Sequence, residues 1–133
     1  MGTILKSLRA VRIFVDDLDR ARQFYRDILE LPEKSVAADW AVFDVDGRDL
    51  ILEAVAHDDP DRALVGRLLA VSFGVDDIDD VYRNLVTRGV SFPEPPKVQP
   101  WGGILAFPRD PDGNVLTLVG RRSPCCATTS TMR

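Results

Sequence analysis

The residues of this chain that could do chemistry are few and scattered. The single histidine, His57, stands in a polar segment, and the only two cysteines, Cys125 and Cys126, are adjacent near the C-terminus. Neighbouring cysteines do not easily reach disulfide geometry. No histidine stands beside them to complete a zinc ligand set. We therefore interpret Cys125 and Cys126 as free thiols and predict no zinc site there.

Two aspartates close to each other, Asp110 and Asp112, look like a pair of catalytic acids. A proline separates them and a glycine follows them, so the segment has the composition of a turn. In such turns aspartate side chains support the local backbone, and we assign these two no catalytic role. The acidic pairs at 16–17 and 58–59 are interpreted as helix-capping or solvated groups.

Arg12 is a charged residue in a segment that is otherwise apolar. A buried charge is costly unless it is paired, and Glu53 is the obvious partner on a neighbouring strand. Two interpretations stay open. The two residues form a structural ion pair, or Arg12 binds an anionic or carbonyl group of a ligand.

An internal repeat organises the elements that must position these residues. VDDLD at 15–19 returns as VDDID at 75–79, a shift of 75 − 15 = 60 positions. Before each copy, apolar residues alternate over 11–15 and 71–75, which predicts a strand with two different faces. After each copy, apolar residues recur at helical spacing, up to residue 29 and to about residue 88. The chain therefore begins a strand and a helix twice.

Further strands complete both halves. Weak patterns predict strands at 35–38 and 97–100, and clearer ones predict strands at 40–45, 50–55, 103–107 and 115–119. Asp46-Gly47 is a strong signal for a hairpin turn. The fold class is therefore α+β, with two βαβββ modules at about 8–56 and 66–121 in one domain, 1–122. A polar linker is expected at 57–62, and a tail at 123–133 is expected to be disordered.

Composition restricts the partners. The chain has 133 residues and a formal net charge of −4, which argues against nucleic acid because phosphate binding needs a concentrated basic patch. Its apolar runs are too short to span a bilayer, which argues against a membrane partner. The N-terminus lacks the apolar core of an export signal. We therefore predict a cytoplasmic protein.

Three segments carry a resemblance to a known family: VRIFVDDLDRARQFY at 11–25, the segment 71–78, and FPRDPDGNVLTL at 107–118. Together they resemble the vicinal oxygen chelate superfamily, which includes glyoxalase I, bleomycin-resistance proteins and extradiol dioxygenases. The resemblance implies that the modules pair into a curved mixed sheet forming an open cup. The helices would lie outside this sheet, and the cup would hold a ligand and often a divalent metal. Members often dimerise, so a homodimer is predicted.

Metal-dependent members place four ligands, usually His and Glu, on the strands of the cup. Carried over to this chain, those positions hold Ala10, Glu53, Ala70 and Thr117. Alanine cannot ligate a metal, and one carboxylate makes no coordination sphere. We therefore predict that this chain has no metal site and no cofactor.

Strand alternation assigns the residues that line the cup. It places Val11, Ile13 and Val15 toward the helix, and likewise Val71 in the second module. The small residues left facing the cup either keep it open for a ligand or allow close packing of the sheet. The two tryptophans either cap the core or stack on a flat ligand. The predicted ligand-binding residues are Arg12, Phe14, Trp40, Glu53, Ser72, Trp101 and Thr117.

The predicted function is metal-independent binding of a small aromatic or hydrophobic molecule, similar to the bleomycin-resistance branch. The alternative is a glyoxalase- or dioxygenase-like enzyme, a lyase or oxidoreductase, whose metal site is atypical or absent. In that case Glu53 is the one candidate base, and the other catalytic residues are unknown. A non-catalytic partner module is a third interpretation.

Overall fold

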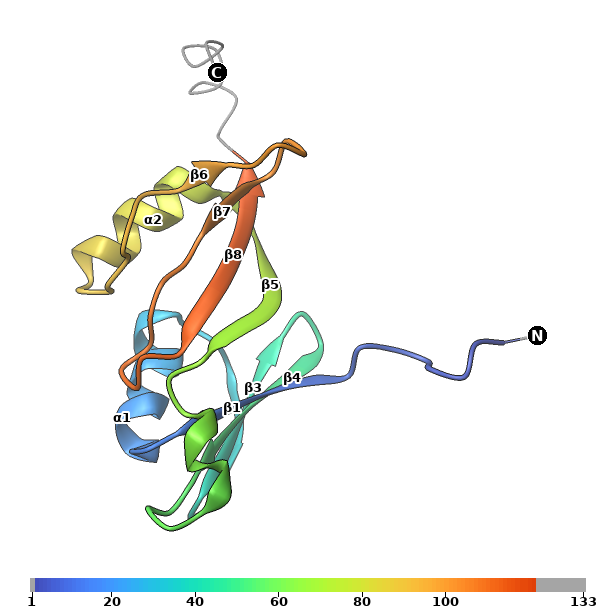
Figure 1. Cartoon of the computed structure of the whole chain (residues 1–133), viewed down its shortest axis with the longest axis vertical. Helices are drawn as coiled ribbons and strands as arrows, with labels where there is room; N and C mark the ends of the chain where they lie inside the picture. Colours follow the sequence, from blue (N-terminus) through green and yellow to red (C-terminus); the bar gives the residue numbers. More distant parts are fainter. Residues whose placement is uncertain (1, 122–133) are drawn as a thin grey trace. The chain divides into compact units, whose positions relative to one another are not determined.

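The structure is a computed structural model that describes residues 2–121. The chain divides into two compact units, Met1–Val65 and Gly66–Arg133. Each unit contains a helical region that follows its first strand and one four-stranded mixed sheet (Figure 1). We describe each unit by itself. The tail predicted at 123–133 lies outside the described residues.

The first unit contains the predicted strand–helix–three-strand module. Its sheet has the order β1-β4-β3-β2, with β1 parallel to β4 and the other neighbours antiparallel. Its elements are β1 (Ala10–Val15), α1 (Leu18–Gln23), the π-helix η1 (Phe24–Ile28), β2 (Glu33–Val36), β3 (Trp40–Val45), β4 (Arg48–Ala54) and the 3-10 helix η2 (Pro60–Leu64).

Alternation along the strands builds the core of the first unit. Ile13 and Val15 of β1 are buried, whereas Arg12 before them is exposed and Phe14 between them is half-buried. The same rule buries one face of β3 and β4, because successive side chains in a strand point to opposite sides. The buried set on this face and in the helix is Ile13, Val15, Ala21, Phe24, Tyr25, Ala41, Phe43, Leu50 and Leu52.

The first helical region is wider at its end than predicted. The predicted helix continues to residue 29, but the regular α-helix stops at Gln23 and a π-helix follows. The wider turn of the π-helix is seen in the hydrogen bond that the Leu29 N–H donates to the Phe24 carbonyl, at 3.0 Å. It accommodates two consecutive buried aromatic residues, Phe24 and Tyr25, whose ring centroids lie 5.0 Å apart in an edge-on pair.

The second unit repeats the order of elements. Its sheet has the order β5-β8-β7-β6, with β5 parallel to β8, and α2 packs on one face of it (Figure 1). Its elements are β5 (Leu68–Asp77), α2 (Ile78–Thr87), β6 (Lys97–Val98), β7 (Ile104–Ala106) and β8 (Val115–Arg121). β6 has only two residues instead of the predicted 97–100, and prolines flank it on both sides. Proline lacks the N–H that a strand ladder needs.

The predicted helix caps and the predicted hairpin turn are confirmed. Asp17 and Asp77 each cap a helix, accepting a hydrogen bond from the backbone N–H three residues on, at 3.2 Å in both cases. The turn between β3 and β4 has φ of 53° at Asp46 and 82° at Gly47. Positive values at both positions are typical of the tight hairpin turn predicted there.

Other boundaries differ from the sequence predictions. The strand predicted at 35–38 lies at Glu33–Val36, so it starts two residues earlier. Part of the predicted linker is η2, capped by Asp59, which accepts a bond from the Asp61 N–H at 2.8 Å. None of the described helices is long and apolar enough to cross a membrane.

The segment around Asp110 is a turn, as predicted, and its polar side chains accept hydrogen bonds from backbone N–H groups. Asp110 Oδ1 accepts from the N–H groups of Asp112 and Asn114, each at 2.9 Å. Asn114 Oδ1 accepts from the N–H groups of Gly66 and Arg67, at 2.8 and 3.1 Å. The motif therefore fastens the start of the second unit to the turn that leads into β8.

Candidate functional site

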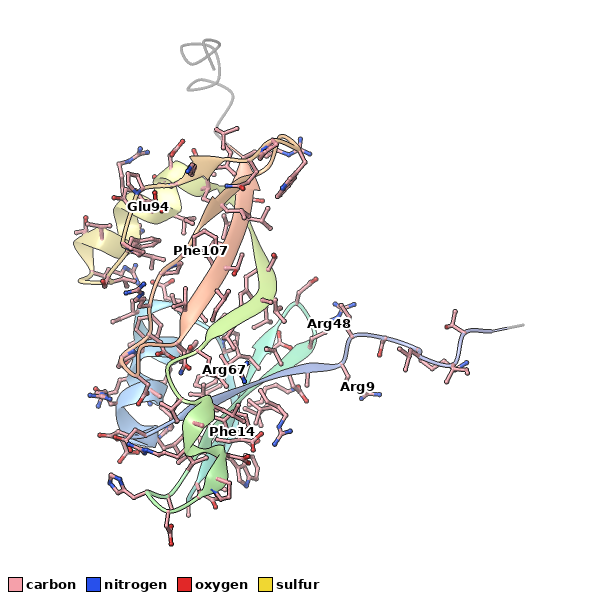
Figure 2. All side chains as sticks on the ribbon, viewed as in Figure 1. Arg9, Phe14, Arg48, Arg67, Glu94 and Phe107 are labelled. Atoms are coloured by element: carbon pink, nitrogen blue, oxygen red, sulfur yellow. The ribbon has the colours of Figure 1, made fainter. Side chains whose placement is uncertain are left out.

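Four of the predicted binding residues lie on one face of the first sheet, the face opposite α1. In the strand register, Glu53 of β4 is paired with Phe14 of β1 on one side and with Trp40 of β3 on the other. Arg12 lies two residues before Phe14 on β1 and so shares this face. We call these four residues, Arg12, Phe14, Trp40 and Glu53, the Arg12–Glu53 face. Figure 2 labels Phe14 in this unit.

The polar centre of this face is a two-point ion pair. Arg12 donates from Nε to Glu53 Oε2 at 2.5 Å and from Nη2 to Oε1 at 3.0 Å. The guanidinium carbon also lies 5.3 Å from the centroid of the Phe14 ring. Such forked contacts between arginine and a carboxylate fix both groups in direction as well as distance. The structural ion pair considered for Arg12 and Glu53 is therefore present, and it lies on a partly exposed surface.

This pairing shifts both ionisation equilibria. The hydrogen bond from Arg12, assisted by its charge and opposed by partial burial, lowers the pKa of Glu53. The hydrogen bond to Glu53 and the charge of Glu53 raise the pKa of Arg12, and Asp61 adds to this. Both residues are therefore ionised at neutral pH. A carboxylate whose two oxygens already accept hydrogen bonds, and whose pKa is lowered, is a weak general base.

The remaining members of the face are aromatic and accessible. Trp40 is 40 % exposed, and Phe14 is half-buried. Val42 and Ile51 are half-buried and alternate with buried residues of β3 and β4, so they add aliphatic surface on the same side. The face thus combines apolar side chains with one fixed polar pair. That composition is usual for small-molecule sites.

Two of the predicted residues in the second unit lie side by side in the register. Ser72 of β5 is paired with Thr117 of β8. Thr117 is buried, and its hydroxyl donates to the Leu69 carbonyl at 3.0 Å. The hydroxyl of Thr117 is therefore used within the sheet, and Ser72 is the exposed member of the pair.

The β5 strand is irregular at this point, which corrects one face assignment. Leu68 pairs with Val115 and Ser72 with Thr117, so β5 spans four residues where β8 spans two. Val71 was predicted to face the helix, but it is exposed. Extra residues in a strand break the alternation of its faces, and this is why the period-two pattern failed there.

Trp101 lies apart from the Ser72–Thr117 pair, in the turn between β6 and β7. Its ring covers Gly103 so closely that a Cβ there would lie 1.9 Å from the nearest ring atom. The absence of a side chain at Gly103 therefore accommodates the Trp101 ring. Trp101 is 66 % exposed and helps to line a hollow of about 670 Å³ in this unit. The lining residues are Val75, Asp76, Trp101, Gly102, Gly103, Val119, Gly120 and Arg121.

The four strand positions at which metal ligands were considered do not offer a ligand set. Ala10 and Ala70 have no donor atom, Thr117 donates its hydroxyl to a backbone carbonyl, and Glu53 is held by Arg12. Within residues 2–121 no group of three His, Cys, Asp or Glu side chains could hold a metal ion. A divalent cation therefore does not fit these residues.

Some surface groups of the two regions could not be predicted. Asp61 acts on Arg12 from the segment expected to be a linker, and Asp76 and Arg121 line the hollow at strand ends. Asp61 and Arg121 lie in no motif, and the VDDID repeat that contains Asp76 predicted only a helix start. The course of the backbone brings all three to these surfaces. Polar residues at strand ends are a weak signal in a sequence.

Two strand–helix–three-strand modules in one chain, carrying DPDGN before the last strand, define a glyoxalase-type fold. The sequence model of one family, the Glyoxalase/Bleomycin resistance protein/Dioxygenase superfamily, matches residues 7–118. The chain belongs to this superfamily.

Individual relatives agree with this assignment. The uncharacterized protein YraH of Bacillus subtilis (strain 168) is 27 % identical over an alignment 124 residues long, which covers 84 % of this chain and 95 % of YraH. A superfamily member from Sphaerobacter thermophilus has a TM-score of 0.71 at 25 % identity, covering 90 % of this chain and 100 % of that one. Lactoylglutathione lyase from Agrobacterium tumefaciens has a similar fold, with a TM-score of 0.72 at 20 % identity and coverage of 89 % and 96 %.

Proposed function

We propose that this protein binds a small, flat aromatic or hydrophobic molecule without a metal ion. The observation that carries the proposal is the Arg12–Glu53 face, where one fixed ion pair stands between Phe14 and Trp40. Ligand sites are typically apolar with a few positioned polar groups. An aromatic ligand would stack against the accessible Trp40 and Phe14 while Arg12 fixes its orientation.

The metal-independent part of the proposal is supported by the donor set. Of the four strand positions, two are alanine and one is a buried threonine whose hydroxyl is already used. A metal would also have to compete with Arg12 for both oxygens of Glu53. Elemental analysis of the purified protein tests this directly. Near-stoichiometric nickel, zinc, iron or manganese would contradict it.

The hollow beside Trp101 is a second surface on which a flat molecule could rest. Its volume of about 670 Å³ lies within the usual range for ligand pockets, about 300–1,000 Å³. The two surfaces can be told apart, because the chain has only two tryptophans and one lies at each. Trp101→Phe leaves Trp40 as the single indole reporter, and Trp40→Phe leaves Trp101.

The test is a titration of both single-tryptophan variants with a panel of flat aromatic compounds, followed by tryptophan fluorescence and calorimetry. We expect saturable changes in the variant that keeps Trp40, and weaker binding after Arg12→Met. A response confined to Trp101 would contradict the Arg12–Glu53 face as the ligand site. If neither variant shows a fluorescence change and calorimetry detects no binding for any compound of the panel, the binding function is refuted.

The alternative function, a lyase or oxidoreductase that uses Glu53 as a base, has less support. Arg12 engages both oxygens of Glu53 and lowers its pKa, and each effect weakens a general base. If the alternative were correct, Glu53→Gln would abolish turnover while leaving the thermal unfolding temperature near that of the natural protein.

A further inference from the structure

The hydrogen bonds of Arg12 leave a defined part of its guanidinium available. A guanidinium has five N–H groups. Those that Arg12 uses in the described structure go from Nε and Nη2 to Glu53, so 5 − 2 = 3 remain. Its side chain is 60 % exposed, so these three are accessible on the edge away from Glu53. A ligand group that meets this edge must be a hydrogen-bond acceptor, because guanidinium offers only donors.

The charges around this edge decide which acceptors are favourable. Glu53 offsets the positive charge of Arg12, and Asp61 acts on Arg12 as a second negative group. The lowered pKa of Glu53 keeps it ionised at neutral pH. A carboxylate on the ligand would therefore approach a region without net positive charge and would meet repulsion from Glu53. A neutral carbonyl would accept the same hydrogen bonds without that repulsion.

The guanidinium is also held in place before any ligand arrives. Glu53 fixes one edge through two hydrogen bonds, and the Phe14 ring lies 5.3 Å from the guanidinium carbon. Fixing a donor in advance reduces the ordering cost of binding. The ligand carbonyl would therefore bind at a set place beside the aromatic surface of Phe14 and Trp40.

From these contacts we infer that Glu53 determines specificity, making the Arg12–Glu53 face select aromatic molecules with a neutral carbonyl over aromatic carboxylates. This rests on the proposed function, and it adds the chemical class of the ligand. In this role Glu53 acts through Arg12 and is a positioning residue.

The test compares two compounds that share one ring system, 2-naphthamide and 2-naphthoate, by calorimetry at neutral pH. We expect the natural protein to bind the amide about tenfold more tightly than the carboxylate. In Glu53→Gln the freed guanidinium should recognise the carboxylate, and we expect the preference for the amide to fall about tenfold. Thermal unfolding of each variant checks that the fold is kept.

Asp49→Asn is the matched control. Asp49 precedes Glu53 by four residues on β4, so it lies on the same face, where it pairs with Lys34 at 2.6 Å. The control removes one negative charge from the same face without freeing Arg12. It should leave the ratio of the two affinities unchanged, which separates release of Arg12 from a general change in charge.

Arg12→Met supplies a second variant that does not depend on Glu53→Gln being stable. Because Arg12 is largely exposed, its loss should be tolerated, and amide binding should weaken about tenfold while binding of naphthalene itself is kept. If the amide binds but neither variant alters the amide-to-carboxylate ratio, the inference is wrong and the binding function stands. If no compound binds any form, the binding function itself fails, and the inference with it.

Discussion

Replacing Asn114 by alanine should destabilise the protein more than any surface substitution. Asn114 is 1 % exposed. Its carbonyl oxygen accepts from the N–H groups of Gly66 and Arg67, at 2.8 and 3.1 Å, and its amide nitrogen donates to Asp110 Oδ2 at 3.0 Å. Alanine removes all three bonds at once.

The size of the effect follows from the surroundings of the three partners. A buried polar group that loses its partner costs about 1–3 kcal/mol. Gly66 and Arg67 are exposed, so water can replace the lost acceptor at part of the cost, whereas Asp110 is buried. We therefore expect Asn114→Ala to lower the free energy of unfolding by about 2–4 kcal/mol, out of the roughly 5–15 kcal/mol of a typical domain. In thermal unfolding this is a drop of roughly 10 °C.

Urea denaturation and thermal unfolding followed by circular dichroism measure this change. Asn84→Ala is the control, because Asn84 is an exposed residue of α2 and its loss should change stability by less than about 0.5 kcal/mol. Asn114→Asp keeps the size of the side chain but replaces its donor by a carboxylate facing Asp110, so it too should destabilise. An Asn114→Ala protein as stable as the control would refute the structural role given to the DPDGN motif.

Two other substitutions test the packing and the electrostatics of each unit. Gly120→Ala should destabilise the protein by about 1–3 kcal/mol in urea denaturation, because the new Cβ would lie 2.7 Å from the Val75 carbonyl oxygen. Gly74→Ala is the control, since a Cβ there meets nothing within 4 Å and should be tolerated. Equal effects of the two substitutions would contradict the packing argument. The ion pair of Arg22 with Glu33, at 2.8 Å, lowers the pKa of Glu33 mainly through its hydrogen bond. Its stabilisation is therefore complete above the ordinary carboxylate range and is lost as the pH falls through the lowered pKa. Glu33→Gln should lower the free energy of unfolding by about 1 kcal/mol at neutral pH. The difference in stability between the variant and the natural protein should vanish on acidification. A constant difference at all pH values would show that the charge of Glu33 is not its cause.

Sequence patterns that act between residues close together in the chain predicted much of the fold. The VDD repeat indicated both helix starts because an aspartate cap acts within three residues, and Asp46-Gly47 indicated the hairpin because both positions need positive φ. The patterns failed where packing overrides local preference. The two adjacent buried aromatic residues Phe24 and Tyr25 lie in a π-helix, and the irregular register of β5 turned Val71 outward.

The candidate site divides in the same way. Alternation in the sequence placed Arg12 and Phe14 on one side of β1, and the spacing of Glu53 from the hairpin placed it on a neighbouring strand. The sequence left open what Arg12 does, because its partner is 41 positions away and depends on the register of β1 with β4. The charge that Asp61 adds, and the use of the Thr117 hydroxyl by Leu69, depend in the same way on which backbones become neighbours.

By itself, then, the sequence determined the duplicated module, the strand faces of the first module and the residue types at the four strand positions considered for metal ligands. These depend on the type of each side chain and on contacts within a few residues, and both can be read directly along the chain. Only the tertiary structure decided that Glu53 is bound at both oxygens and that the Trp101 ring covers Gly103. Hydrogen bonds and ring contacts require atoms within a few ångströms, and folding alone sets such distances between residues far apart in sequence.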